Sequence, residues 1–241
     1  MDKLIILNIT FLRDGEEVIF HPAIIVGDKE NIMIDCGYPG FLLILETEAQ
    51  KNDFDFSKLT KIIVTHHDHD HIGALYEIKE KYPHIKIVSS TIEKPYIEGT
   101  KKSLRLLQTE KIFPNLAPEL QEEALEFQKI LESVKYVPVD ITIDNDKEID
   151  FLEDIDIIHT PGHMPGHISV YHKKSKTIIT GDAMVAEDGI LHMANPQYTL
   201  DLIRAKESIR QFLDYDVEQI LCYHGGLITG DVKSIIKKLL K

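Results

Sequence analysis

The sequence predicts an α/β protein, and three features of the chain point to this class. Of its 241 residues 43% are hydrophobic, which is enough for a sizeable core. Short β-rich runs alternate with segments of helical periodicity. The order of strands followed by helices is coarsely repeated along the chain, without low-complexity tracts or short repeats. We therefore expect a globular unit of the size of an enzyme.

The first half of the chain begins with strands. Runs 4–12, 17–27 and 31–35 are β-rich, and Arg13, Asp14 and Gly15 form a predicted turn between the first two. The elements predicted after them are a helix over 40–50, a strand over 61–65, a helix over 74–82 and a strand over 85–90. A strand meander is thus followed by an α/β pattern.

Residues 92–135 interrupt this pattern. Two helical stretches, 103–113 and 119–134, are separated by Pro114 and Pro118, and the segment is too long for an ordinary connection. We interpret it as a helical insertion.

The second half returns to short strands and ends in helices. Its predicted strands cover residues 135–143, 147–152, 154–160, 167–173 and 176–182. A helix over 200–215, a strand over 218–226 and a helix over 231–241 complete the chain. We treat residues 1–241 as one domain.

Composition excludes several classes of partner. With 27 Lys and Arg against 40 Asp and Glu, the net charge of −13 would repel a polyphosphate backbone, so no nucleic acid is expected. No apolar run could span a bilayer, and residues 1–11 are interpreted as a first strand rather than a signal peptide. We expect a cytoplasmic protein with no membrane partner, and with Cys36 and Cys222 reduced and buried. The oligomeric state stays open.

Residues 61–73, KIIVTHHDHDHIG, form an apolar run that ends in four histidines and two aspartates within six positions. These side chains bind divalent metals, and gathering them is costly unless something neutralises them. The cluster follows a predicted buried strand, where α/β proteins place their chemistry. This position argues against the alternatives of a solvated polar loop or an adventitious metal scavenger.

Spacing alone leaves two registers open for this motif. In an extended segment alternate side chains share a face. Either His66, Asp68 and Asp70 or the intervening histidines 67, 69 and 71 could converge.

Five motifs in order between about residues 32 and 226 resemble those of the metallo-β-lactamase superfamily. Thr65-His66 and Asp70-His71 match the family's HxHxDH loop in its TH-x-x-x-DH-x-G frame. IIHTPGHMPGHISVY is similar to its second histidine loop, with His163, and IITGDAM to its GD loop. YHGG resembles the segment of the last ligand, and MIDCGYPG resembles the family's IDTG turn, where Asp35 would support the site from outside the ligand set.

The resemblance implies a four-layer αββα sandwich of two mixed sheets, with the site at one edge where the loops meet. It also implies two divalent ions per chain. The first ion would be bound by His66, Asp68, His163 and Asp182. The second would be bound by Asp70, His71, His224 and the shared Asp182.

One position departs from the family pattern, because Asp68 stands where the second histidine of HxHxDH is expected. A carboxylate adds negative charge and hardness, which favours iron or manganese relative to zinc. The flavodiiron branch also has a carboxylate there. We expect zinc, with iron or manganese as alternatives.

A dinuclear site of this kind implies a hydrolase. The leading hypothesis is cleavage of a small-molecule ester, thioester, lactone or similar acyl bond by metal-bound hydroxide, with phosphoester hydrolysis as a variant. Asp70 would orient the nucleophile or receive a proton, and His224 or a metal would steady the oxyanion. The alternatives are an iron-dependent redox enzyme, suggested by Asp68, and a metal-binding protein without turnover.

The remaining polar residues are expected to lie outside the set of metal ligands. His67 and His69 point away from the metals in the chosen register, and we expect them to be exposed rather than hydrogen-bonded around the site. His167 is expected to pack or to hydrogen-bond rather than to bind metal. A lysine-rich stretch is interpreted as a solvated helix face, or else as a recognition surface for an anionic substrate formed by Tyr96, Lys101, Lys102 and Arg105.

Overall fold

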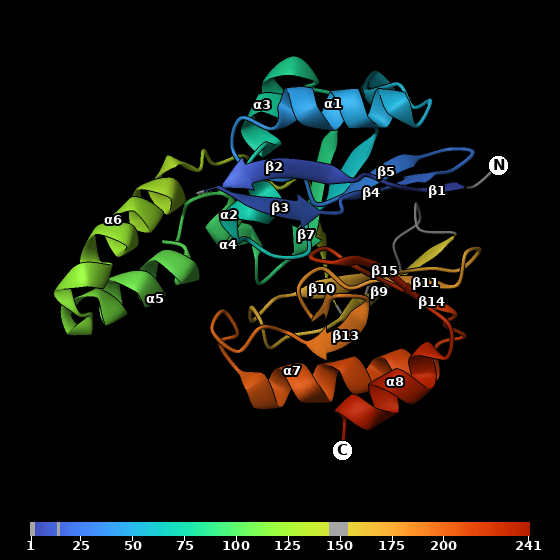
Figure 1. The fold of residues 1–241 in the computed structure, drawn as a ribbon. Helices are drawn as coiled ribbons and strands as arrows, with labels where there is room; N and C mark the ends of the chain where they lie inside the picture. The colour runs from blue at the N-terminus through green and yellow to red at the C-terminus, as the bar shows by residue number, and fades with distance from the viewer. Residues whose placement is uncertain (1–2, 14, 145–153) are drawn as a thin grey trace.

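The computed structural model describes residues 3–13, 15–144 and 154–241. In this structure two β-sheets pack face to face, and helices cover both outer faces (Figure 1). The predicted αββα sandwich is therefore confirmed. The predicted strand over 147–152 and the turn residue Asp14 lie outside the described residues.

Within the described residues the first sheet has six strands in the order β1-β4-β5-β6-β7-β8. The strands are β1 (Lys3–Ile6), β4 (Ala23–Val26), β5 (Asn31–Ile34), β6 (Lys61–Ile63), β7 (Lys86–Ser90) and β8 (Ile141–Ile143). Pairing is antiparallel from β1 to β5 and parallel from β5 to β8. The carboxyl ends of β5, β6 and β7 consequently meet at one edge.

The second sheet has the order β15-β14-β11-β10-β9. Its strands are β9 (Ile155–His159), β10 (Ile168–His172), β11 (Thr177–Ile179), β14 (Gln219–Cys222) and β15 (Gly226–Thr229). Only β11 and β14 run parallel among these pairs. Because both sheets mix the two pairing modes, each can send several loops to the same edge.

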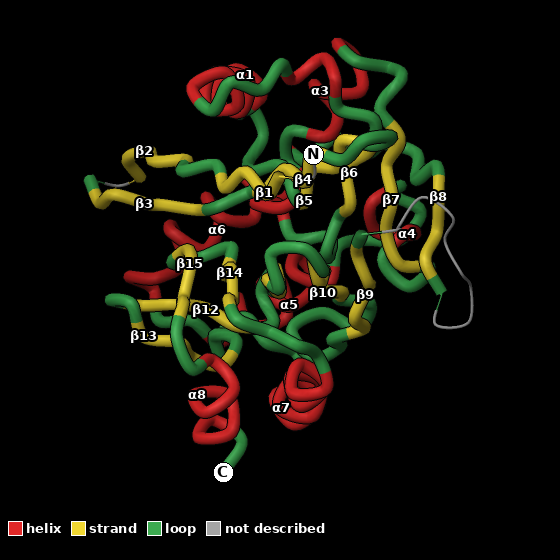
Figure 2. Tube along the Cα trace, turned by 90° about the vertical axis from the view of Figure 1, so that its right-hand side faces the viewer, coloured by secondary structure: helices red, strands yellow, loops and turns green. Residues whose placement is uncertain are grey.

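Two hairpins stand outside the sheets and lie on the same side of the sandwich (Figure 2). One pairs β2 (Ile9–Arg13) with β3 (Glu16–Phe20), and the other pairs β12 (Met184–Glu187) with β13 (Ile190–Met193). Both approach His224, since Phe20 forms a bridge with it and the Ala186 N–H donates to its carbonyl at 2.9 Å. The hairpins thereby fix the backbone of a candidate ligand.

The helices lie on the outer faces of the two sheets, where they bury their apolar sides. α1 (Leu42–Lys51) and α3 (Leu75–Lys81) cover the first sheet, and α7 (Leu202–Ile209) and α8 (Val232–Leu239) cover the second (Figure 1). Val232 and Ile236 of α8, one turn apart, are buried against the sheet. The other helices are α2 (His69–Ile72), α4 (Lys94–Ile97), α5 (Leu104–Ile112) and α6 (Pro118–Ser133), with short 3₁₀ turns at Phe56–Lys58, Phe113–Asn115 and Arg210–Asp214.

Branched aliphatic side chains fill the space between the sheets. Ile34 and Ile63 come from the first sheet, Val170 and Ile179 come from the second, and all four belong to one buried cluster. Each strand alternates its side chains between this layer and the layer beneath the helices. The four layers are therefore held together by burial on both faces of each sheet.

Three strand predictions were wrong in extent. Residues 4–12 divide into β1 and β2, and residues 17–27 divide into β3 and β4, with Pro22 between them. Proline cannot donate to a ladder, so a long β-rich run can break there and enter two sheets. Of residues 135–143 only the last three form a strand. The β12–β13 hairpin was not predicted.

Helices α4, α5 and α6 lie between β7 and β8, where the helical insertion is expected. Figure 1 shows α5 and α6 projecting beside α2 and α4 at the edge that carries the histidine loop. None of the helices in the described residues has the length and apolar character needed to cross a membrane.

Candidate metal centre

The candidate ligands lie on loops that leave the strands at one edge of the sandwich. The loop after β6 carries the first histidine motif, and α2 begins within it at His69. His163 lies between β9 and β10, Asp182 follows β11, and His224 follows β14. Residues far apart in the sequence are brought together because both sheets end at this edge.

A first cluster joins His66, Asp68 and His163. Asp68 Oδ2 lies 3.1 Å from His163 Nε2 and 3.4 Å from His66 Nε2. Asp182 Oδ2 lies 3.6 Å from His163 Nε2. Tetrahedral ligands with bonds of about 2.1 Å are about 3.4 Å apart, so these four side chains fit around one cation.

A second cluster joins Asp70, His71 and His224. Asp70 Oδ2 lies 3.2 Å from His224 Nε2 and 3.9 Å from His71 Nε2. Asp182 completes the group, because its Oδ1 lies 3.3 Å from His71 Nε2 and 3.6 Å from His224 Nε2. All seven residues predicted as ligands are thus brought together in two adjoining clusters.

Buried polar atoms that contact one another without forming hydrogen bonds support cation binding. Nε2 of His66, Nε2 of His71 and Oδ1 of Asp182 are buried and accept or donate no hydrogen bond. Buried polar atoms are almost always satisfied, and each exception needs an explanation. The donor set of imidazole nitrogens and carboxylate oxygens matches divalent transition metals, so the residues present fit such an ion.

The backbone at Asp182 depends on a glycine. Gly181 has a φ of +51°, and a Cβ there would lie 2.8 Å from Thr65 Oγ1 and 2.9 Å from His167 Nε2. Only glycine avoids both the strain and the overlap. Gly181 therefore allows the loop after β11 to approach the histidine loop.

Asp35 orients the second cluster from behind. Its carboxylate is fully buried and accepts hydrogen bonds from Thr65 N–H at 2.8 Å, Thr65 O–H at 2.8 Å and His71 Nδ1–H at 2.8 Å. His66 Nδ1 lies 3.0 Å from the same threonine oxygen. Because the Nδ1 atoms of both histidines are engaged, their Nε2 atoms face the clusters, an arrangement typical of metal-binding histidines.

The carboxylates and imidazoles shift each other's pKa values. Although burial opposes it, His71 and His224 hold the pKa of Asp182 well below its usual range. Conversely Asp182 raises the pKa of His71, together with Asp35, against the effect of burial. Asp182 also raises the pKa of His224. These histidines keep protons that a bound cation would displace.

The expectation that His67 and His69 are exposed is wrong, because the insertion covers both. The imidazole of His67 donates from Nδ1 to Glu93 and accepts from the Leu104 N–H at 3.2 Å. His69 is packed edge-on against Phe127, with a ring separation of 5.4 Å. Neither histidine belongs to a group of the described residues that could hold a metal, although His69 Nδ1 lies 3.5 Å from Asp70 Oδ1.

Glu93 was missed by sequence reasoning and joins the two histidine loops. It is fully buried and accepts from the His67 N–H at 3.0 Å and from the Gly166 N–H at 2.8 Å. His167 is held as expected, by Thr160 Oγ1 at 2.8 Å and by the Asp182 N–H at 3.1 Å. No local pattern in the sequence distinguishes Glu93 from a solvated helix residue.

The expected recognition surface is corrected by the structure. Arg105 is 2% exposed and forms an ion pair with Asp68 at 2.6 Å, so it does not lie on a solvated face. Tyr96 stacks on His67 at 4.4 Å. Lys101 and Lys102 are exposed, with Lys102 paired to Glu110. Both cysteines are buried and unpaired, as predicted.

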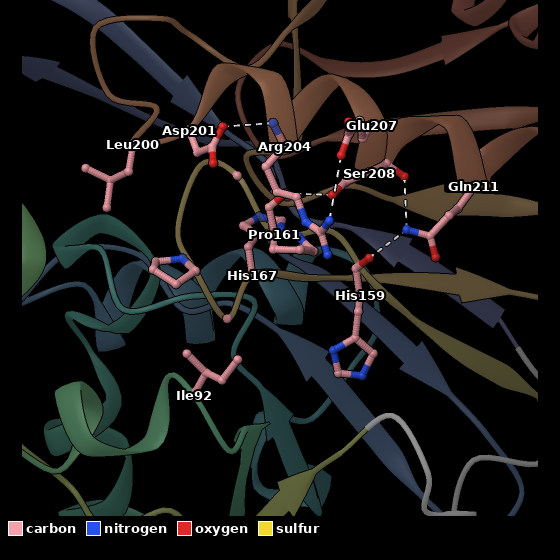
Figure 3. A pocket seen from close by; sticks show the side chains of 13 residues that line it. Ile92, His159, Pro161, His167, Leu200, Asp201, Arg204, Glu207, Ser208 and Gln211 are labelled. Carbon is pink, nitrogen blue, oxygen red and sulfur yellow. Dashed lines mark hydrogen bonds and ion pairs between the residues drawn. The ribbon is translucent and has the colours of Figure 1, made fainter.

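A cavity of about 630 Å³ lies along the second histidine loop and α7, and none of the seven candidate ligands lines it (Figure 3). Its polar groups are largely engaged with each other. Gln211 donates to the His159 carbonyl at 2.9 Å, and Ser208 donates to the Pro161 carbonyl at 2.6 Å. The cavity therefore offers no chemistry comparable with that of the two clusters, and we assign it no role.

Comparison with known proteins agrees with the fold and the clusters. The family model of the metallo-β-lactamase superfamily matches residues 19–224. The chain is 28% identical over 212 residues to the probable metallo-hydrolase YflN of Bacillus subtilis (strain 168), covering 83% of this chain and 76% of the relative. It is 24% identical over 169 residues to a hydroxyacylglutathione hydrolase of Synechococcus sp., covering 70% of this chain and 50% of that protein.

A solved structure gives the same fold. The metallo-β-lactamase family protein TTHA1429 from Thermus thermophilus superposes with a TM-score of 0.73 at 18% identity, over 98% of this chain and 78% of that chain. The sandwich, the histidines and aspartates clustered at its edge and the relatives named as metallo-hydrolases together define the class of the protein. This chain belongs to the metallo-β-lactamase superfamily and is a hydrolase of that fold.

Proposed function

We propose that this protein uses two divalent ions to hydrolyse an ester, thioester, lactone or similar acyl bond of a small molecule. The observation that carries the proposal is the position of Asp182. Its Oδ1 faces His71 and His224, and its Oδ2 faces His163. A carboxylate between two histidine clusters supports two cations held side by side.

The ligand sets follow from the clusters. The first ion is assigned to His66, Asp68, His163 and Asp182. The second ion is assigned to Asp70, His71, His224 and Asp182. The imidazole-rich donor set favours zinc, and the three carboxylates make iron and manganese the alternatives.

Divalent ions at these positions supply acidified water and polarisation of a substrate oxygen when bound. Asp70 stays ionised, because despite its burial the histidines 71, 69 and 224 hold the pKa of its carboxyl far below the usual range. It is therefore able to accept a hydrogen bond from the attacking water and to orient it, whereas the lowered pKa makes this carboxylate a weak proton acceptor. The His224 side chain is 31% exposed, more than Asp182 at 12%, so substrate approaches beside His224, where we place the oxyanion.

An aromatic wall beside Asp70 supports an organic substrate. His69 lies between Tyr38, at a ring separation of 5.2 Å, and Phe127 of α6, at 5.4 Å. The His69 Nδ1 is 3.5 Å from Asp70 Oδ1. A wall of rings next to the carboxylate proposed to orient the water suits a small molecule with an apolar part.

Metal-depleted protein reloaded separately with zinc, manganese or, without oxygen, ferrous iron tests the proposal. We expect hydrolysis of p-nitrophenyl acetate, a thioester or a lactone to return as the content approaches two ions per chain. His71→Ala should abolish turnover, and the exposed His84→Ala serves as its control. Absence of acyl hydrolysis with every metal would reject the proposal. Hydrolysis of a phosphodiester alone would show that the substrate bond is a phosphoester and not an acyl bond.

An iron-dependent redox activity is the second candidate, because Asp68 places a hard oxygen donor in the first cluster. Protein purified without oxygen and analysed for metal content discriminates the two functions. Oxygen uptake by the iron-loaded protein in the presence of a reductant would favour the redox activity. Acyl hydrolysis by the zinc-loaded protein favours the hydrolase, because zinc has no redox chemistry.

A further inference from the structure

Arg105 of α5 reaches into the first cluster and binds the residue that departs from the family pattern. Its Nε donates to Asp68 Oδ1 at 3.2 Å and its Nη2 donates to Asp68 Oδ2 at 2.6 Å. The two side chains are 3% and 6% exposed. This is a buried, two-pronged ion pair, in which the planar guanidinium fixes the plane of the carboxylate.

The other donors of the guanidinium hold Arg105 in place. Nη1 donates to Gln108 Oε1 at 2.6 Å, and Nη2 donates to the Tyr198 carbonyl at 2.7 Å. Nη2 also lies 3.3 Å from His163 Nε2. Arg105 therefore rests on the Asp68–His163 edge of the first cluster, tied both to its own helix and to the segment before α7.

The guanidinium of Arg105 balances the negative charge that Asp68 brings to a position where the family has a histidine. An aspartate in place of a neutral histidine adds one negative charge to a site that already holds Asp182. The guanidinium adds one positive charge, so that Asp68 and Arg105 together have the net charge of neutral imidazole. Although burial opposes it, Arg105 holds the pKa of Asp68 well below its usual range, so the carboxylate stays ionised.

The ligand distances show that Arg105 does not displace Asp68 from the cluster. Asp68 Oδ2 keeps separations of 3.1 and 3.4 Å from the two histidine nitrogens while it accepts from Arg105. A carboxylate oxygen has lone pairs for both partners. The same oxygen can therefore face a cation on one side and the guanidinium on the other.

We propose that Asp68 and Arg105 act as one unit that replaces the histidine of the common ligand set, with Asp68 as ligand and Arg105 as the positioning residue that orients and neutralises it. This inference rests on the metal centre of the proposed function. It makes the insertion part of the site, because α5 supplies Arg105. It also means that restoring the histidine alone does not restore the common site.

Four proteins test the unit: the wild type, Asp68→His, Arg105→Leu and the double variant. The readouts are ions per chain by elemental analysis and the affinity for zinc in competition with a chromophoric chelator. Asp68→His leaves a buried guanidinium without its carboxylate, beside imidazoles and a cation, and should bind the first ion about tenfold more weakly or worse. The double variant removes that cation and should recover to within about threefold of the wild type.

Arg105→Leu supplies a readout independent of activity. Without the guanidinium the carboxylates of Asp68 and Asp182 lie in the first cluster without a cation to balance them, so the metal-free variant should melt at a lower temperature than the metal-free wild type. Zinc should then raise its melting temperature by more than it raises that of the wild type. The exposed Arg204→Leu, whose arginine pairs only with Glu207 in the described ion pairs, should match the wild type.

Three results would overturn the inference. Zinc affinity of Asp68→His equal to or above that of the wild type would show that Arg105 needs no carboxylate. Additive effects in the double variant would show two independent residues. One ion per wild-type chain and two per Arg105→Leu chain would show that the guanidinium takes the place of the first ion. A wild type that binds no ion rejects the proposed function itself, whereas two bound ions with additive effects reject only the unit.

Discussion

The two carboxylate oxygens of Asp182 face different histidines, with Oδ1 3.3 Å from His71 Nε2 and Oδ2 3.6 Å from His163 Nε2. We expect Asp182→Ala to lose both ions and all activity, because nothing else in the loop after β11 reaches either cluster. Elemental analysis after dialysis against zinc checks this. Asp201→Ala, at the exposed N-terminus of α7, is the control, and two ions retained in Asp182→Ala would refute the bridging role.

Asp35 should matter for metal affinity without being a ligand. Asp35→Asn keeps the shape of the side chain but weakens the acceptor of the His71 Nδ1–H. Loss of such a partner typically weakens metal binding about 10- to 100-fold, so the second ion should dissociate first. Stepwise chelator competition measures this, and unchanged affinity for both ions would show that Asp35 acts only in the fold.

Metal affinity should rise with pH. The pKa values of His71 and His224 are raised in the metal-free protein, mainly by Asp182 against the effect of burial. Their protonation stabilises that protein fully below about pH 6.5, and this contribution is lost as pH rises through the raised values. In that window zinc should displace protons, which titration calorimetry in buffers of different ionisation enthalpy detects. Zinc uptake without proton release would contradict the raised pKa values.

The carboxylates should make the stability of the metal-free protein depend on pH in the opposite direction to the histidines. The pKa values of Asp70 and Asp182 are depressed by neighbouring histidines despite burial. Their contribution to the stability of the metal-free protein is present above about pH 4 and is lost as pH falls through the depressed values. In Asp70→Asn the free energy of unfolding by urea should therefore fall less steeply as the pH is lowered below about pH 4. An unchanged curve would show that Asp70 is not ionised and paired in the folded protein.

Glu93 should be important for stability, although it lies outside both clusters. Glu93→Ala leaves the His67 and Gly166 N–H groups without acceptors and removes the partner of the His67 imidazole. We expect a loss of about 3 kcal/mol or more in the free energy of unfolding by urea. Glu110→Ala, which removes an exposed ion pair, should change it by no more than about 0.5 kcal/mol. Similar losses for the two variants would refute the structural role.

The sequence by itself determined the α/β class and the position of the histidine cluster, and its resemblance to a known family supplied the candidate ligands. Alternation of strands and helices is a local pattern, and the apolar run before His66 ends where a buried strand must end. The order of the motifs, from Asp35 to His224, places each candidate after or between strands. These features depend on residues close to each other in the chain, so they can be read without tertiary contacts.

Tertiary structure decided how long strands divide and what surrounds the site. The run 4–12 is uniformly β-rich, and only the docking of β1 in the first sheet and of β2 in a hairpin separates its halves. The positions of the β2–β3 and β12–β13 hairpins beside His224 likewise depend on tertiary packing. Strand pairing joins distant segments, and propensity does not specify the partner.

The pairing of Asp68 with Arg105 shows the same limit inside the site. The two residues are 37 positions apart, and Arg105 lies in a stretch with the composition of a solvated helix. His67, His69 and Glu93 are buried for the same reason, because the insertion folds back over the histidine loop. A side chain's pattern in the sequence indicates its chemistry, whereas its burial and its partner depend on which distant segment packs against it.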